Sequence, residues 1–190
     1  MKFRIAATAL ALTTLGASAF AQTYVGVAAG RTNTCVHDPA GNCSNDATSV
    51  KTLVGYAWPD TDFAIEGIYT HLGSFKHGST RGSVDSKIDT LGVGGAWRPQ
   101  FGAGFGAVLR AGLELGRART DYTNVYLGTP ILSTSSSHSQ DFWQPYGGAG
   151  LTYAITRNIH LELDVDVTRV KATNSPTNAR SWMLGATYGF

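Results

Sequence analysis

The chain has 190 residues, with 15 lysines and arginines against 13 aspartates and glutamates. This near balance gives no basis for nucleic-acid binding, and 23 glycines argue against a helical protein. Beyond the N-terminal segment no run of 18 apolar residues occurs, so no transmembrane helix is expected. The mean hydropathy of −0.07 remains compatible with strands in which apolar and polar residues alternate.

The first 21 residues have the pattern of a secretory signal peptide. Two basic residues precede an apolar stretch that is too short for a membrane-spanning helix, and Ala-x-Ala sequences end at Ala19 and Ala21. We therefore expect an exported protein in which residues 1–21 are removed and residues 22–190 form one domain. Cleavage before residue 22 is favoured, and cleavage after Ala19 is the alternative.

Two cysteines, Cys35 and Cys43, lie close together in a polar segment that also contains Pro39 and Gly41. In an exported protein such a pair is expected to form a disulfide. A metal site that includes His37 is the alternative, but no fourth ligand is evident. We expect neither a bound metal nor a cofactor.

Eight segments alternate apolar and polar residues with a period of two, which is typical of strands. The clearest is His160–Val167, where apolar and acidic residues alternate after the first position. The last segment, Ser181–Phe190, has one large apolar face and the length that a tilted strand needs to cross a bilayer. The eight predicted strands are 24–31, 49–58, 63–73, a fourth that ends at residue 97, 105–119, 142–154, 160–167 and 181–190.

The connections between these segments alternate in length. Short turns are expected at 59–62, 98–102 and 156–158, and long polar loops at 33–48, 74–84, 121–140 and 171–180. Alternating long and short connections with an even number of strands are typical of barrels in bacterial outer membranes.

The two faces of the predicted strands differ in size and charge. One face is apolar and carries aromatic residues near the strand ends, as the two interfaces of a bilayer favour. The other face combines glycines with charged residues, and the core of a soluble β-sandwich or lipocalin-like barrel could not hold so many ionised groups. Near the short turns the aromatic residues are Tyr56, Trp58, Phe63, Trp97, Tyr153, Tyr188 and Phe190, and toward the long loops they are Tyr69, Trp143 and Trp182. The charged residues expected in the lumen are Lys51, Glu66, Arg110, Glu114, Glu162, Asp164 and Asp166.

These patterns predict an all-β protein, an eight-stranded antiparallel up-and-down transmembrane β-barrel. Five inward acids face only two inward bases, so we expect some acids to lie at the wet ends of the lumen or to be neutral. The interior of such a barrel is just wide enough for side chains and should form a polar plug. A narrow cation-conducting path lined by the acids is the alternative.

Several segments resemble the OmpA-type family of outer-membrane barrels, which includes OmpX-like and opacity-protein-like barrels. Residues 148–159, followed by Leu161–Asp164, resemble the sixth and seventh strands of the family; residues 63–69, with the inward Glu66, resemble the third, and Arg110-Ala111-Gly112 the fifth. The resemblance covers the mature chain and implies an outer-membrane location in a Gram-negative bacterium. It also implies that Tyr188 and Phe190 act as the signal for the barrel-assembly machinery. The chain departs from the family in having no periplasmic domain after the last strand, and in having Glu162 where the family often has an inward arginine.

Catalysis is not expected, although some small outer-membrane barrels modify lipid A. Ser137, His138 and Asp141 are close in sequence, but a catalytic triad is defined by fixed geometry and not by adjacency. The outer loops are the expected functional surface. Lys76, Arg81 and Lys87 are candidates for binding lipopolysaccharide phosphates or an acidic host or matrix glycan. The sequence thus predicts a non-enzymatic barrel that contacts outer-membrane lipid and serves envelope structure and adhesion.

Overall fold

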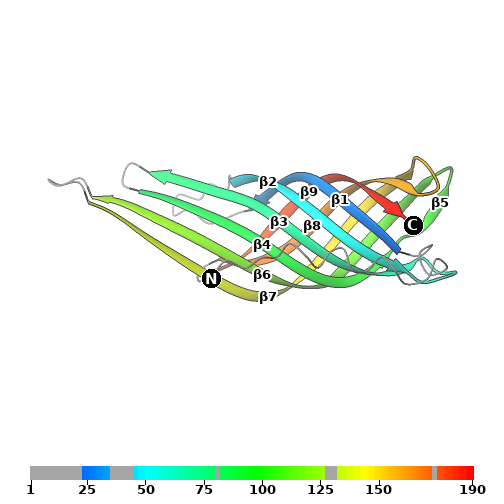
Figure 1. Ribbon diagram of the computed structural model, residues 1–190, viewed down its shortest axis with the longest axis horizontal. Coiled ribbons are helices and arrows are strands. Elements are labelled where there is room, and N and C mark those ends of the chain that lie inside the picture. Colours follow the sequence, from blue (N-terminus) through cyan, green and yellow to red (C-terminus); the bar gives the residue numbers. More distant parts are fainter. Residues whose placement is uncertain (1–22, 35–44, 80–81, 127–131, 173–174) are drawn as a thin grey trace.

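Long antiparallel strands that pair with their neighbours in the chain make up the fold (Figure 1). The structure, a computed structural model, describes residues 23–34, 45–79, 82–126, 132–172 and 175–190. The strands in this part of the chain are β1 (Thr23–Thr34), β2 (Asn45–Ala57), β3 (Phe63–Ser79), β4 (Gly82–Trp97), β5 (Gln100–Gly102), β6 (Phe105–Tyr126), β7 (Leu132–Ala154), β8 (Ile159–Ala172) and β9 (Ser175–Gly189).

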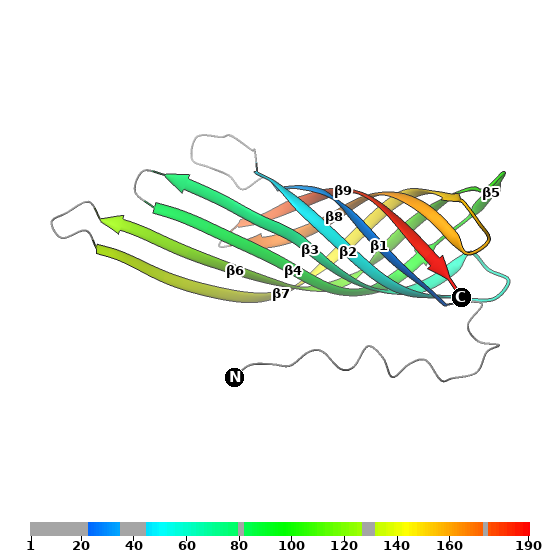
Figure 2. The same cartoon turned by 45° about the horizontal axis from the view of Figure 1, so that its top comes forward.

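The sheet closes on itself because β1 pairs with both β2 and β9, and β4 pairs with β6 (Figure 2). The three-residue β5 pairs only with β6 and belongs to the turn that joins β4 to β6. Eight strands therefore form the ring, and the predicted antiparallel up-and-down barrel is confirmed. A closed ring leaves no unpaired sheet edge in the hydrocarbon layer of a membrane.

Residues alternate between the lumen and the outer wall along each strand. In β1 buried and exposed positions alternate through most of the strand. Large apolar side chains on the outer wall are widely exposed, including Val27, Leu91 and Leu184 at 62% each. Such a continuous apolar band is unfavourable in water and favourable against lipid tails. Within the described residues, no helix is long and apolar enough to cross a membrane.

Strands extend into all four predicted long loops. Pairing between β3 and β4 continues to Ser79 and Gly82, and pairing between β6 and β7 continues to Tyr126 and Leu132, so the loops predicted at 74–84 and 121–140 are wrong. The loops predicted at 33–48 and 171–180 are shorter than expected for the same reason, since β1, β2, β8 and β9 all extend into them. A strand that leaves the membrane faces water on its outer side, so its sequence becomes polar while its backbone pairing continues.

The barrel is longer on one side than on the other (Figures 1 and 2). The β2–β3 ladder ends at His71, just before a bulge at Gly73, whose φ of +101° suits glycine. The β7–β8 ladder ends at Tyr146, next to Pro145, which has no N–H to donate to a ladder. Beyond these points β3, β4, β6 and β7 continue as a four-stranded sheet above the shorter side.

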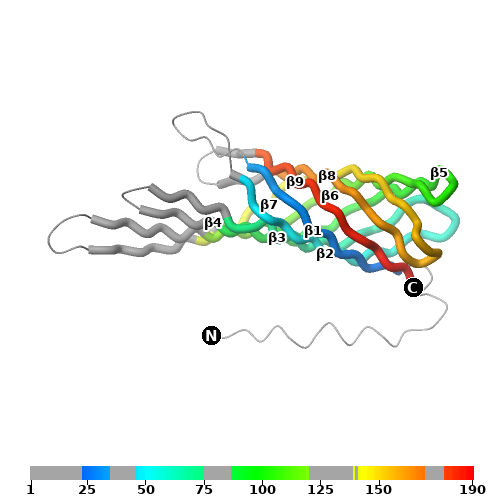
Figure 3. Tube along the Cα trace, turned by 90° about the horizontal axis from the view of Figure 1, so that it is seen from above, coloured from blue at the N-terminus to red at the C-terminus, as the bar shows by residue number. Residues whose placement is uncertain are grey.

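The first described residue and the C-terminus meet at the end of the barrel that carries the short turns (Figure 3). The backbone N–H of Phe190 donates a hydrogen bond to the carbonyl of Thr23 at 3.0 Å. At the same end the backbone N–H of Gly189 donates to the carbonyl of Asn158 at 2.8 Å. The seam between the first and last strands is therefore paired down to the final residue.

Candidate functional site

Arg110 is the centre of an ionic network in the lower lumen, the half of the interior next to the short turns. Its side chain extends inward from β6 and is 0% exposed. Nε donates to Glu66 at 2.6 Å, and Nη1 donates to Asp164 at 3.0 Å. The second terminal nitrogen, Nη2, donates to Glu162. One guanidinium thus binds carboxylates from two strands, β3 and β8, across the barrel.

Arg98 is a third interior base, which the sequence analysis assigned to a turn. It follows the last residue of β4, and its side chain reaches back into the lumen, donating to Glu66 at 3.0 Å and to Glu162 at 2.9 Å. Its guanidinium lies 4.8 Å from the ring centre of Tyr24, whose hydroxyl donates to Glu66 at 2.5 Å. The excess of inward acids in the sequence indicated that a further base should lie in the lumen. Arg98 was a candidate, because an arginine one residue past a strand end is long enough to fold inward.

Lys51 extends the network toward the middle of the barrel. Its Nζ donates to Asp164 at 2.6 Å and to Asp166 at 2.7 Å. Glycines on β7 make room for these two acids: a Cβ on Gly148 would lie 2.1 Å from Asp166 Oδ1, and one on Gly150 would lie 2.2 Å from Asp164 Oδ1. The frequent inward glycines therefore provide the space that the charged residues of β8 occupy.

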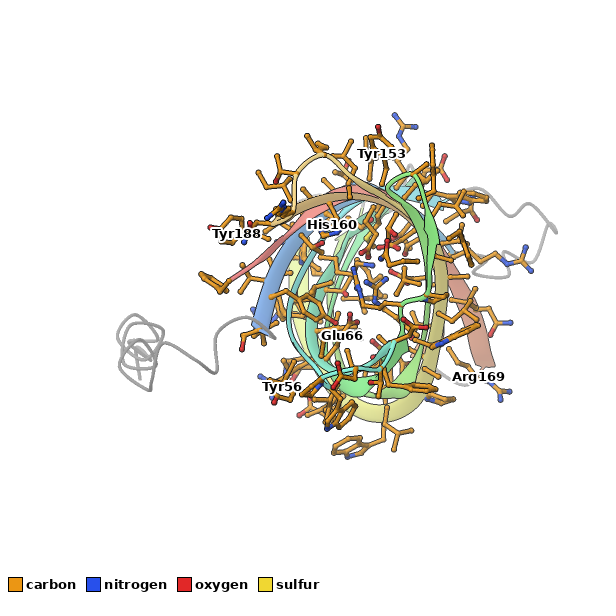
Figure 4. All side chains as sticks on the ribbon, turned by 90° about the vertical axis from the view of Figure 1, so that its right-hand side faces the viewer. Tyr56, Glu66, Tyr153, His160, Arg169 and Tyr188 are labelled. Atoms are coloured by element: carbon orange, nitrogen blue, oxygen red, sulfur yellow. The ribbon has the colours of Figure 1, made fainter. Side chains whose placement is uncertain are left out.

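Glu114 is separate from this network. Its carboxylate accepts hydrogen bonds from Gln144 Nε2 at 2.6 Å and from the hydroxyl of Thr168. Six of the seven predicted lumen residues and Arg98 form one connected network, and Glu114 lies above it with neutral partners. Figure 4, a view along the barrel, shows Glu66 inside the ring and Tyr56, Tyr153 and Tyr188 on its outer wall.

An apolar cluster lies in the lumen at the other end, above Glu114. We call it the upper cluster; its members are buried, and their neighbours along each strand, which face outward, are mostly polar or charged. A hollow between the charged residues of the lower lumen and the upper cluster has a volume of about 20 Å³, enough for about one water molecule. The upper cluster consists of Ala47, Leu72, Ile88, Phe142 and Ala179.

The outer wall changes from apolar to charged at the level of the upper cluster. On the longer side the charges are paired: Arg117 binds Asp141 at 2.8 and 3.1 Å, and His71 lies 2.7 Å from Asp89. Hydrogen bonding from Arg117 holds the pKa of the exposed Asp141 carboxyl below its usual range. On the shorter side the exposed outward residues include Arg31, Arg169 and Arg180.

The aromatic residues predicted to form two girdles all lie on the outer wall. Those near the short turns are 39–57% exposed, with Tyr56 the least exposed, and those toward the outer end are at least 45% exposed. The exposures are 39% for Tyr56, 47% for Trp58, 57% for Phe63, 41% for Trp97, 44% for Tyr153, 45% for Tyr188 and 50% for Phe190, and 45% for Tyr69, 68% for Trp143 and 61% for Trp182.

The predicted loop residues are placed only in part. Lys87 is exposed on β4, and Lys76 lies on β3 opposite Asp85 in the ladder. Arg81, Cys35 and Cys43 lie outside the described residues, as does the signal-peptide segment.

Of the candidate catalytic group, the structure describes only the side chain of Asp141. Ser137 and His138 are strand residues of β7 whose side chains lie outside the description, and both carboxylate oxygens of Asp141 bind Arg117. Across the described part of the chain, no three histidine, cysteine or acidic residues are grouped so as to hold a metal ion.

A closed ring with an apolar outer wall, two aromatic girdles and an ion-paired interior defines an integral membrane β-barrel. A family model described as "outer membrane protein beta-barrel domain" matches residues 5–190. The chain therefore belongs to this family, and its location is the outer membrane. A search of curated proteins gave no match.

Solved outer-membrane barrels share the fold. Neisserial surface protein A (NspA) is 20% identical with a TM-score of 0.65, covering 88% of this chain and 97% of its own. The attachment invasion locus protein Ail of Yersinia pestis is 19% identical with a TM-score of 0.52, covering 89% and 97%. OprG from Pseudomonas aeruginosa is 15% identical with a TM-score of 0.52, covering 90% and 96%. A further structure of Ail, with a TM-score of 0.51, is a complex with the heparin analogue sucrose octasulfate.

Proposed function

We propose that this barrel is a non-enzymatic surface protein that binds acidic ligands through the parts of the chain outside the membrane. The observation that carries the proposal is the extension of β3, β4, β6 and β7 beyond the shorter side of the barrel. A paired four-stranded sheet is a rigid support for the two hairpin ends, at Ser79 and Gly82 and at Tyr126 and Leu132, and segments on rigid supports commonly carry binding.

Acidic polysaccharides are the ligand class that the basic residues of the β3–β4 hairpin favour. Lys76, Arg81 and Lys87 supply positive charge there, and sulfate, carboxylate and phosphate groups are their natural partners. The complex of Ail with a heparin analogue supports this choice for a barrel of the same fold. Lipopolysaccharide at the cell surface offers phosphate groups to the same residues.

The interior supports a sealed barrel and not the alternative of an ion path. The lower lumen holds a network of ion pairs among buried apolar residues such as Leu53 and Val108, and the upper cluster adds an apolar layer. An ion would have to cross that layer. Purified protein should therefore give no reproducible conductance steps in planar bilayers. Steps whose cation preference changes in Glu162→Gln would instead establish the channel.

Binding is tested by replacing the tip of the β3–β4 hairpin. Substitution of Lys76, Arg81 and Lys87 by glutamine should abolish cell binding to immobilised heparin, while folded protein in the outer membrane stays constant. Folding is followed by the change in electrophoretic mobility between unheated and boiled samples. A matched control replaces Asp60, Asp62 and Arg157 in the short turns at the opposite end. Unchanged heparin binding in the tip variant would overturn the proposal, as would lipid A mass spectra that differ between expressing and deleted cells.

Assembly is proposed to depend on the C-terminal aromatic residues. Phe190 packs edge-on against Tyr188 with ring centres 5.2 Å apart, and both are exposed on the outer wall where assembly machinery could contact them. Deletion of Phe190 should reduce the heat-shifted, folded fraction in the outer membrane several-fold. Phe101→Ala, at an exposed aromatic residue in the turn between β4 and β6, is the control. If both variants assemble equally well, the C-terminal aromatic residues are not the assembly signal.

The segment between β1 and β2 is proposed to carry a Cys35–Cys43 disulfide, and residues 1–21 a cleaved signal. Pairing of Thr34 with Asn45 brings the two flanks of the cysteine segment together, which supports the disulfide. Reductant should change the mobility of the mature protein, and Cys35→Ser should abolish that change. If N-terminal sequencing of the mature protein begins at Met1, the prediction of a cleaved signal peptide is wrong. If it begins at Phe20, cleavage occurs after Ala19.

A further inference from the structure

A groove lies on the lipid-facing wall where β7 separates from β8. The outward residues of β7 beside the separation are Pro145, Gly147 and Ala149, which are small or compact. Together with Val165 and Val167 of β8 they line a mostly apolar hollow. The groove lies level with the outer part of the barrel, because the separation marks the start of the extended sheet. Its floor suits a hydrocarbon chain that runs along the strands.

Positive charge collects at the outer end of this groove. Arg169 and Asn178 line that end and face each other across the β8–β9 ladder. Arg180 is the next outward residue of β9 after Asn178, so it is a diagonal neighbour of Arg169. Arg31 lies opposite Trp182 in the β1–β9 ladder, so it is also a diagonal neighbour of Arg180. Diagonal neighbours of this kind lie about 7–8 Å apart, so long side chains can bind one anion together. Figure 4 shows Arg169 pointing away from the barrel axis.

These arginines differ from the charges at the same level on the longer side. There, Arg117 and His71 each face an aspartate. Among the side chains that the structure describes, no carboxylate forms an ion pair with Arg31, Arg169 or Arg180. All three lie at or just outside the level of Trp182 in the outer girdle, where the headgroups of the outer leaflet begin.

We propose that the groove and its arginines bind one molecule of lipopolysaccharide. One acyl chain of its lipid A lies against Gly147, Ala149 and Val167, and a lipid A phosphate accepts charge-assisted hydrogen bonds from Arg169 and Arg180. An apolar groove that ends in guanidinium groups without an ion-pair partner among the described side chains matches a ligand with a hydrocarbon tail and a phosphate head. This inference deepens the proposed contact with lipopolysaccharide and is independent of ligand binding at the hairpin tips.

Native mass spectrometry of the full mature barrel in detergent tests the phosphate contact. Lipid A, dephosphorylated lipid A, phosphatidylglycerol and inorganic phosphate are the four probes. We expect one lipid A per barrel, and we expect Arg169→Gln to weaken its binding about tenfold, with a larger loss when Arg180→Gln is added. Arg157→Gln, an exposed arginine in a short turn, should leave binding unchanged.

Filling the groove tests the acyl-chain contact. A Cβ on Gly147 would have its nearest neighbour at 3.7 Å, so Gly147→Leu should fold and occupy the groove. Gly67→Leu is the matched control, because Gly67 lies on β3 and a Cβ there would lie 3.6 Å from Val54. We expect at least a tenfold loss of lipid A binding in Gly147→Leu only.

Several outcomes would overturn the proposal. These are equal binding of dephosphorylated lipid A or phosphatidylglycerol, displacement of lipid A by inorganic phosphate, a dimeric mass that disappears in Gly147→Leu, and equal effects of the two leucine variants. Heparin binding by cells, measured in parallel, separates this inference from the proposed function. Loss of lipid A binding with heparin binding intact supports the groove, and failure of heparin binding at the hairpin tips leaves the groove result unaffected.

Discussion

The lower lumen and the upper cluster lie in one barrel, yet the charged residues lie on opposite sides of its wall in the two regions. In the lower lumen Arg110 and its carboxylates face inward beside buried apolar residues such as Val108, and the outward side chains are apolar. In the upper cluster Leu72, Ile88 and Phe142 face inward, and charged or polar residues such as Asp89 and Asp141 face outward. The same paired strands therefore pass from lipid into water. The side in contact with lipid must be apolar, and above the membrane the interior must be apolar because the exterior meets water.

Removing the central cation of the lower lumen should have the largest effect. Arg110→Met leaves Glu66, Glu162 and Asp164 with fewer partners in a buried site, and we expect a loss of about 3–5 kcal/mol in the free energy of unfolding. Urea unfolding of the refolded barrel in micelles, followed by tryptophan fluorescence, measures it. Arg157→Met is the exposed control. A loss equal to that of the control would mean that the network does not stabilise the barrel.

Truncation within the upper cluster should have the next largest effect. Ile88 is 5% exposed, and Ile88→Ala should cost roughly 2–4 kcal/mol through lost burial and a cavity. The neighbouring Lys87 is exposed, so Lys87→Ala should change the unfolding midpoint little. If both variants unfold at the wild-type urea concentration, the upper cluster is not a core in the sense argued above.

Two of the interior glutamates, Glu162 and Glu114, should respond differently to neutralisation. Glu162→Gln reduces the charge opposite Arg98 and Arg110 and should cost roughly 1–3 kcal/mol. In Glu114→Gln the new amide oxygen can still accept from Gln144 and Thr168, so we expect a change within about 1 kcal/mol. The urea midpoints of the two variants provide the comparison. A larger loss for Glu114→Gln would show that its charge is required.

The smallest effect is expected at the outer rim. The pKa of Asp141 is lowered by Arg117, so any stabilisation from this pair is present above the ordinary pKa of an aspartate and is lost as pH falls through the lowered pKa. In Arg117→Gln, NMR titration should find the pKa of Asp141 closer to its ordinary value. Because the pair is exposed, the urea midpoint at neutral pH should not change measurably. An unchanged pKa would show that the pair does not persist in solution.

The sequence was sufficient to predict the ring, because lipid on one side and a narrow lumen on the other impose a strict alternation. The same alternation correctly separated inward charges such as Lys51 from outward aromatic residues such as Trp97. The strand ends were mispredicted because polar outward residues in water resemble loop residues. Arg98 was missed because alternation does not describe a side chain that folds back from a turn. The pairing of Arg117 with Asp141 depends on ladder register, which periodicity alone does not give.

The hydrogen bond between Phe190 and Thr23 has a consequence for the order of events in biogenesis. The two strands that meet at this seam, β1 and β9, are the first and the last strands of the ring to be synthesised, so the ring cannot close before β9 has been made. Until then any partial sheet has two open edges, which a membrane interior tolerates poorly and which favour aggregation in water. The chain must therefore be held unfolded from the ribosome to the membrane, and the insertion step has to bring its two ends together.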